Sequence, residues 1–165
     1  MGKVYKNNVL GYAGGISHTD DEVVIASVNA SSGSIAFGQP VFLNADGTGV
    51  IPISDNTDVS RFVGIAVRSG AKTPDVYEDP TGGIANSVAS YRKGEVMDIL
   101  VRGCIVVECT SGTIKPGMPV YFNKMVGAAS ATSSDLTITV PDIYFKTSRD
   151  GSGRAEILLT KRNIQ

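Results

Sequence analysis

The chain has 165 residues, with 15 Lys and Arg against 16 Asp and Glu, and a formal net charge of −1. This length suits one compact domain or two small fused units. The charged fraction is 19%, below the roughly 25% of ordinary soluble domains; such a surface fits a protein packed against neighbours and a free neutral protein equally well. Basic residues never run beyond two in a row, which argues against nucleic-acid binding.

No apolar run is long enough to cross a bilayer. The first twenty residues contain no apolar stretch typical of a signal peptide. We therefore expect synthesis in a cytoplasm and no membrane partner.

Residues 1–21 form the first predicted segment, an extended arm that contains Tyr5, Tyr12 and Ile16 between Gly and Asn residues. This pattern is too broken to build a core, so the arm either frays or lies on another surface. The loop 69–83, which contains Tyr77, is longer than a simple hairpin needs. Long loops on a rigid sheet often carry function, although many are tolerated insertions.

Beyond the arm, the Val and Ile patterns predict strands. In chain order the expected strands are 22–30, 39–44, 50–53, 61–68, 95–108, 118–123, 136–140, 143–147 and 154–161. Gly103 should either divide the fifth of these or introduce a bulge. Residues 55–60 and 84–91 are short, ambiguous helix candidates.

A thirteen-residue segment occurs twice, without a gap. Residues 32–44 read SGSIAFGQPVFLN and residues 111–123 read SGTIKPGMPVYFN, with seven identities at an offset of 79. The repeat predicts an all-β barrel or sandwich built from two related β units by internal duplication. We expect an arm (1–21), a first unit (22–101) and a second unit (102–165) packed as one body; the alternative is one barrel that uses the same hairpin twice by convergence.

Catalytic and metal-binding patterns are missing from the sequence. His18 is the sole histidine, and its polar surroundings in the arm favour a solvated turn over a catalytic triad. The acidic cluster at 20–22 lacks the spacing of a calcium loop, and Cys104 and Cys109 lack the further ligands of a zinc site. We read both cysteines as small buried residues. The prediction is a non-enzyme with no catalytic residue, no cofactor and no metal.

An ordered set of short motifs carries a family resemblance. It runs from Tyr12-Ala13-Gly14, through residues 33–41 and Phe62-x-Gly64-Ile65-Ala66, to residues 112–121. Together these motifs resemble the structural cement proteins, the capsid decoration proteins of tailed bacteriophages, over about residues 5–159. The matched positions carry over only as determinants of backbone shape, namely Gly33, Gly38, Pro40, Gly64, Gly112, Gly117 and Pro119.

The resemblance implies a virion protein on the outer capsid surface, where it clamps neighbouring major capsid subunits, and a homo-oligomer, with a trimer favoured over a dimer. Our hypothesis is that the capsid or oligomer contacts come from apolar residues in segments unable to bury them, namely Tyr5, Tyr12, Ile16 and Tyr77. Two alternatives stay open: a tail, fibre-base or connector component, and a glycan-binding β-barrel.

Overall fold

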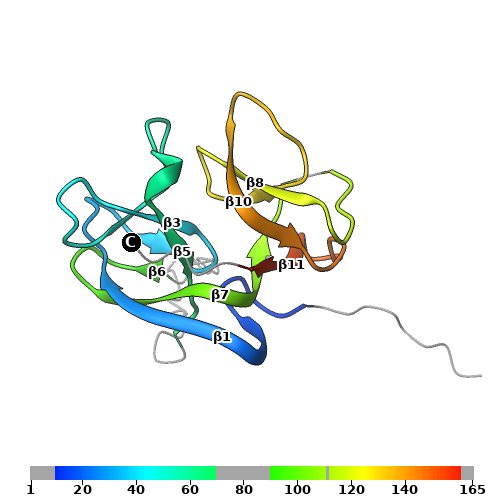
Figure 1. Cartoon of the computed structure of the whole chain (residues 1–165), viewed down its shortest axis with the longest axis horizontal. Helices are drawn as coiled ribbons and strands as arrows, with labels where there is room; N and C mark the ends of the chain where they lie inside the picture. The colour runs from blue at the N-terminus through cyan, green and yellow to red at the C-terminus, as the bar shows by residue number, and fades with distance from the viewer. Residues whose placement is uncertain (1–9, 70–89, 111, 161–165) are drawn as a thin grey trace, which may run out of the picture.

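The computed structural model describes residues 10–69, 90–110 and 112–160, with backbone alone for residues 18–20. Within these ranges the chain is almost entirely β-strand, which confirms the all-β prediction (Figure 1). The elements are β1 (Ile16–Val28), β2 (Ile35–Ala36), β3 (Pro40–Leu43), β4 (Val50–Pro52), the 3-10 turn η1 (Val59–Arg61), β5 (Phe62–Ala66), β6 (Ser90–Tyr91), β7 (Val96–Glu108), β8 (Pro119–Asn123), β9 (Ala129–Ser130), β10 (Thr137–Phe145) and β11 (Arg154–Leu159).

One large sheet organises the molecule. Its strand order is β4-β3-β5-β7-β11-β10-β8-β9, β1 pairs with β7, and β2 and β6 form a separate ribbon. The first part of β7 pairs with β1 and β5, and its last part pairs with β11. In Figure 1, β7 accordingly runs from the group of β3 and β5 to the group of β8, β10 and β11.

The sheet curls back on itself at both ends. Asn29, just after β1, forms a parallel bridge with Val50 of β4, and Cys109, just after β7, forms a parallel bridge with Ala129 of β9. The first bridge brings the β3–β4 hairpin at one end of the sheet against the end of β1, and the second brings the β8–β9 hairpin at the other end against the end of β7. The curl encloses the apolar side chains that the Val and Ile patterns predicted.

Two apolar clusters fill the curled sheet. The larger draws fully buried side chains from both halves of the chain, among them Phe42, Ile105, Phe122, Phe145 and Ile157. The smaller lies in the first half, between β2, β3, β6 and the start of β7. The burial of β7 follows from this position: exposed and buried side chains alternate at its start, and residues 103–107 are all buried.

Backbone hydrogen bonds repeat along the chain at the offset of the sequence repeat. Ala66 N donates to Gln39 O at 2.9 Å, and Phe145 N, 79 residues later, donates to Met118 O at 2.9 Å. The β3–β4 turn repeats likewise: Asn44 N donates to Gly49 O as Asn123 N donates to Ala128 O, both at 2.9 Å. The similarity of backbone therefore extends beyond the thirteen residues of the repeat.

The strand pairings repeat as well. The register of β1 on β7 runs from Val24 opposite Leu100 to Val28 opposite Val96. The register of β7 on β11 runs in the same way from Cys104 opposite Leu158 to Glu108 opposite Arg154. Adding 80 to a residue number in β1 gives the corresponding residue in β7, and adding 58 to a residue number in the first part of β7 gives the corresponding residue in β11. The pair Ala26–Asp98 therefore corresponds to the pair Val106–Glu156.

The structure differs from the predicted elements in three places. First, β1 begins at Ile16, well before the expected start at residue 22, because β7 offers an edge on which residues 16–18 pair. Second, 136–140 and 143–147 form one strand, β10, which passes through a register shift at Asp142 with φ +63°. Third, the helix candidate 55–60 is a 3-10 turn at Val59–Arg61, whereas 90–91 of the second candidate form β6 and its residues 84–89 lie outside the described ranges.

The shape-determining positions of the repeat lie at turns and strand starts. Pro40 and Pro119 open β3 and β8, where a strand tolerates the loss of an N–H. Gly64 crosses so close to β7 that an added Cβ would lie 2.2 Å from Leu100 O. Gly33 and Gly112 lie in open turns, and their role as fold determinants stays a prediction.

Candidate docking site at the root of the N-terminal arm

Residues 10–15 lie on the chain's own body, where they form the root of the arm between residues 1–9 and β1. Gly14 N donates to Val106 O at 2.8 Å, and Arg68 N donates to Gly14 O at 2.7 Å. A Cβ at Gly14 would lie 2.8 Å from the Cβ of Phe37, and φ there is +77°, so this close approach requires glycine. The sequence Tyr12-Ala13-Gly14 thus fixes the point from which the arm leaves.

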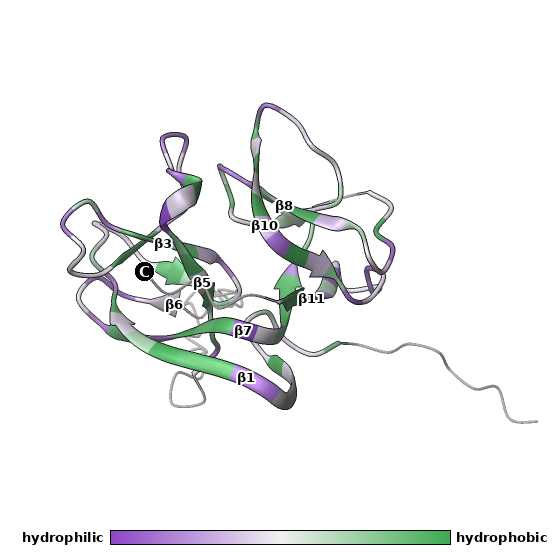
Figure 2. Ribbon diagram, viewed as in Figure 1, coloured by the Kyte–Doolittle hydropathy of each residue, from purple (hydrophilic) through white to green (hydrophobic). Residues whose placement is uncertain are grey.

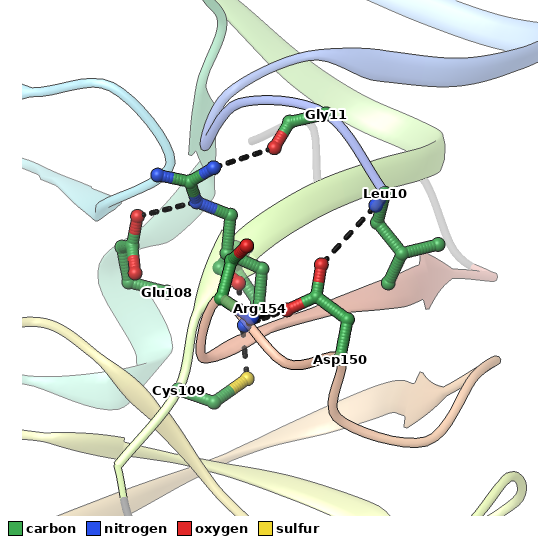
Figure 3. A network of polar contacts seen from close by, with 8 residues as sticks. Leu10, Gly11, Glu108, Cys109, Asp150 and Arg154 are labelled. Atoms are coloured by element: carbon green, nitrogen blue, oxygen red, sulfur yellow. Dashed lines mark hydrogen bonds and ion pairs between the residues drawn. The ribbon is translucent and has the colours of Figure 1, made fainter. Parts of the chain in front are cut away.

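A polar network also holds Leu10 and Gly11 of this segment (Figure 3). Arg154 Nη1 donates to Gly11 O and Arg154 Nε donates to Glu108 Oε1, both at 2.7 Å. Asp150 Oδ2 accepts from Leu10 N at 3.1 Å, and its Oδ1 accepts from Arg154 N at 2.9 Å. The network links the arm root to β7 and to the loop before β11.

The charge of Asp150 matters to this network. Burial alone would raise the pKa of Asp150, but backbone N–H donors from Arg154, Leu10 and Ser152, with the charge of Arg154, outweigh it and lower the pKa below its usual value. Asp150 is therefore a carboxylate that accepts from three backbone donors at neutral pH.

Tyr12 stands on this support as an exposed aromatic ring. Its relative exposure is 63%. The Arg68 guanidinium carbon lies 4.5 Å from the ring centroid and that of Arg154 lies 5.5 Å away, within the range of cation–π attraction. Tyrosine and arginine are enriched where protein interfaces gain most of their binding energy. This Tyr12 surface, consisting of Tyr12, Arg68 and Arg154, has the composition and rigidity of a docking site.

The other predicted contact residues are not part of the Tyr12 surface in the described structure. Ile16 is half-buried at the start of β1 and packs against the larger core cluster. Tyr5 and Tyr77 lie outside the described residues. Arg68 and Arg154 were missed, because nothing in the sequence places either one beside Tyr12.

A cluster of reactive side chains lies elsewhere, beside a surface cleft of about 330 Å³ lined by Asp21, Arg102, Cys104 and Lys146 among others. Lys146 Nζ lies 3.3 Å from Cys104 Sγ and 3.5 Å from Oε1 of buried Glu156, which also accepts from Ser17 Oγ at 2.7 Å. The contacts tie β1, β7 and β11 to the residue after β10. We read the cluster as a structural ion pair.

The described ranges contain no group of three or more metal-ligating side chains. They also contain no helix long and apolar enough to cross a membrane. Both cysteines are free and buried, and burial raises the pKa of the Cys109 thiol to about 12.

Comparison with known proteins gives the family. The model of the structural cement protein family (E217 gp24/Pam3 gp6) matches residues 2–160. No curated protein sequence matches the chain. Among solved structures, a chain from the capsid of Myoviridae phage XM1 is similar in fold with a TM-score of 0.73 at 15% identity, covering 96% of this chain and 99% of that one.

A weaker similarity, with a TM-score of 0.42 at 12% identity, relates 88% of this chain to 99% of the head fibre gp8.5 N base of bacteriophage phi29. The family match spans nearly the whole chain, including the Tyr12 surface and both halves of the curled sheet. The chain belongs to the structural cement protein family.

Proposed function

We propose that this cement protein binds the outer surface of the phage head and holds neighbouring major capsid subunits together, and that the Tyr12 surface is one of its contacts. Membership of the structural cement family supports a role on the capsid. A cement protein must add binding free energy across many subunit seams, and repeated modest contacts supply it through avidity. The role is structural, and no catalytic step is proposed.

The assignment of this contact depends on one observation: the ring of Tyr12 is both exposed and held in place by its neighbours. A ring that is 63% exposed contributes little to the fold, yet two arginines and the Gly14 turn hold it in place. A rigid aromatic anchor loses little conformational entropy on binding, so more of its contact energy appears as affinity. Aromatic and arginine side chains together suit a partner surface that is partly apolar and carries negative charge.

The test compares Tyr12→Ala with Tyr144→Ala on expanded heads. Tyr144 is a matched control, because it is 41% exposed and lies on β10, which contributes no residue to the Tyr12 surface. We expect Tyr12→Ala to lower the occupancy of the protein on purified heads at limiting concentration, while Tyr144→Ala binds as the wild type does. Equal occupancy for the two variants would remove Tyr12 from the interface.

The position on the particle tests the role itself. Electron cryo-microscopy of decorated particles is expected to show this chain over seams between major capsid subunits. Density confined to the tail or to one vertex would favour the tail or connector alternative. The same maps give the oligomeric state, for which we propose a trimer.

We also infer that the two halves arose by internal duplication, with units at 22–101 and 102–165 behind the arm at 1–21. Support comes from hydrogen bonds and registers that repeat at fixed offsets. Two fragments divided at this boundary test the inference. This boundary lies inside β7, so each fragment carries part of that strand. Association of separately expressed 1–101 and 102–165 into a folded complex is the expected result, and failure of the fragments to associate would count against two separable units.

A further inference from the structure

Among the residues that the structure describes, none pairs with the outer edge of β1 between Val24 and Ala26, whereas the counterpart of this edge in the second half is covered. Val106, near the end of β7, has both backbone groups occupied on that side: Val106 N donates to Gly15 O at 2.9 Å and Gly14 N donates to Val106 O at 2.8 Å. The position that corresponds to Val106 in the first half is Ala26. In the described part of the chain β1 pairs with β7 alone, apart from the bridge at Asn29.

The backbone groups of Ala26 face this open edge. Asp98, opposite Ala26, uses its carbonyl on the far side of β7, where it accepts from Val67 N at 2.8 Å. The pair Ala26–Asp98 is therefore a non-hydrogen-bonded pair, and the N–H and C=O of Ala26 point away from β7. An exposed edge of this kind is a template for an added strand.

The edge is short, which limits what fits on it. From Val28 onward β4 occupies the same side, because Ala30 N donates to Val50 O at 2.9 Å. A second copy of β1 paired about a two-fold axis would thus collide with β4, and a shift toward the start of β1 would set the acidic residues Asp21 and Glu22 against their own copies. The free length suits a short extended segment instead.

Charge and apolar surface indicate which segment. Asp21, Glu22 and Asp98 are exposed around the edge, and of these Asp21 pairs with Arg102. The second half of β1 is apolar, as Figure 2 shows, and Val24 and Val28 are 40% and 37% exposed. Residues 1–9 carry Lys3 and Lys6 without any acidic residue, and they contain Val4 and Tyr5. The arm is complementary to this edge in charge and in apolar character.

The reach of the arm decides between the same chain and a neighbour. Arg154, which holds Gly11, is paired with Glu108 on β7, whereas Ala26 lies opposite Asp98, ten residues away along that strand. Ten strand residues span about 33 Å. Val4 lies six residues before the anchored Leu10, and six fully extended residues span at most roughly 20 Å, so a chain's own arm could not place Val4 beside its own Ala26.

We propose that residues 1–9 of one copy add a strand to the β1 edge at Val24–Ala26 of a neighbouring copy. In such a strand Val4 and Tyr5 point to opposite faces, so one of the two covers the face that carries Val24 and Val28. Lys3 or Lys6, according to the direction of the added strand, then lies toward Asp21 and Glu22. The inference does not depend on the capsid role, since both partners are this chain, and it is tested without phage heads.

Cross-linking between different chains is the direct test. A chain with Val4→Cys is mixed with a chain carrying Val24→Cys, oxidised, and analysed by non-reducing electrophoresis and peptide mass mapping. A disulfide between the two chains supports the proposal. As a matched control, Val24→Cys is replaced by Thr139→Cys, an exposed position on β10; equal cross-linking there would overturn it. A disulfide formed only within one chain carrying both Val4→Cys and Val24→Cys would show that the arm docks on its own edge, and would also overturn it.

A charge exchange gives an independent readout by sedimentation equilibrium. Glu22→Lys, or Lys3→Glu with Lys6→Glu, is expected to weaken self-association by about tenfold, the effect of roughly 1.4 kcal/mol. The combined variant, with both sets of charges reversed, is expected to recover most of the affinity. Unchanged association in the separate variants, or no association of the wild type at any concentration, would contradict the proposal.

Discussion

Gly38 and Gly117 make the same hydrogen bond in the two halves of the molecule. Gly38 N donates to Ala66 O at 2.8 Å, and Gly117 N donates to Phe145 O at 2.7 Å, with φ angles of +80° and +84°. Their surroundings differ, however. A Cβ at Gly38 would lie 3.0 Å from Gly14 N, whereas a Cβ at Gly117 would have no atom within 4 Å.

This difference predicts unequal costs for the same substitution. Gly117→Ala is expected to lower the free energy of unfolding by about 1 kcal/mol, since only the left-handed backbone disfavours it. Gly38→Ala carries that cost plus a further 1–3 kcal/mol or so for displacing the arm root. Urea unfolding of the two variants measures the difference, and equal losses would contradict the close contact with Gly14.

Asn29 and Cys109 occupy corresponding positions with different chemistry. Asn29 is 1% exposed; its Nδ2 donates to Gly33 O at 2.9 Å and Tyr91 O at 3.0 Å, and its Oδ1 accepts from Ser31 N. Asn29→Ala should lower the free energy of unfolding by about 1–3 kcal/mol, because buried polar groups lose their partners. Cys109→Ala removes a single buried sulfur and should cost about 1 kcal/mol or less. Denaturant unfolding of the two variants measures both losses. A larger loss of unfolding free energy for Cys109→Ala than for Asn29→Ala would contradict the stabilising role of the Asn29 hydrogen bonds.

The lowered pKa of Asp150 predicts a pH dependence. A carboxyl whose pKa is lower in the folded protein stabilises the fold above its unfolded pKa of about 3.9, and this contribution disappears as pH falls through the folded value. Asp150→Asn should therefore destabilise the protein at pH 7, and the difference from wild type should shrink as the pH falls below about 4. Urea unfolding at pH 7, 5 and 3 measures this, with Asp46→Asn in the exposed β3–β4 turn as the control for an equal change in charge. A constant difference across pH would count against the network.

Cys109 should resist alkylation in the folded protein. Burial raises its pKa to about 12, so at pH 8 about one part in ten thousand is thiolate, the nucleophilic form. We expect iodoacetamide to label Cys109 slowly in buffer and rapidly in urea, with mass mapping to separate its peptide from that of Cys104. Rapid labelling without urea would show that the β7–β9 bridge opens readily.

Local sequence predicted the fold class well because strand periodicity and turn residues are local signals. The repeat also identified β3 and β8 with their hairpins, since Gly-x-Pro-Val marks a turn followed by a strand. The start of β1 was misplaced because residues 17–21 are polar and become part of a strand through the pairing of β1 with β7. Pro141 and Asp142 were read as a break, whereas the flanking pairs with β8 and β11 carry β10 through them.

The candidate site was only partly predictable. Tyr12 was named because an aromatic residue among glycines has no evident core to enter. Arg68 and Arg154 come from distant parts of the chain and reach the ring only after β5, β7 and β11 are paired, so no local pattern could identify them. The open edge at Ala26 became visible only through its counterpart at Val106.

The length of β7 has a mechanical consequence for a structural cement protein. It is one uninterrupted strand of 13 residues shared by both halves, with β1 and β5 alongside its first part and β11 alongside its last. A pull that separates the two halves acts along this strand, so rows of hydrogen bonds must shear together instead of opening one by one. A molecule built in this way transmits tension between its contacts with little extension.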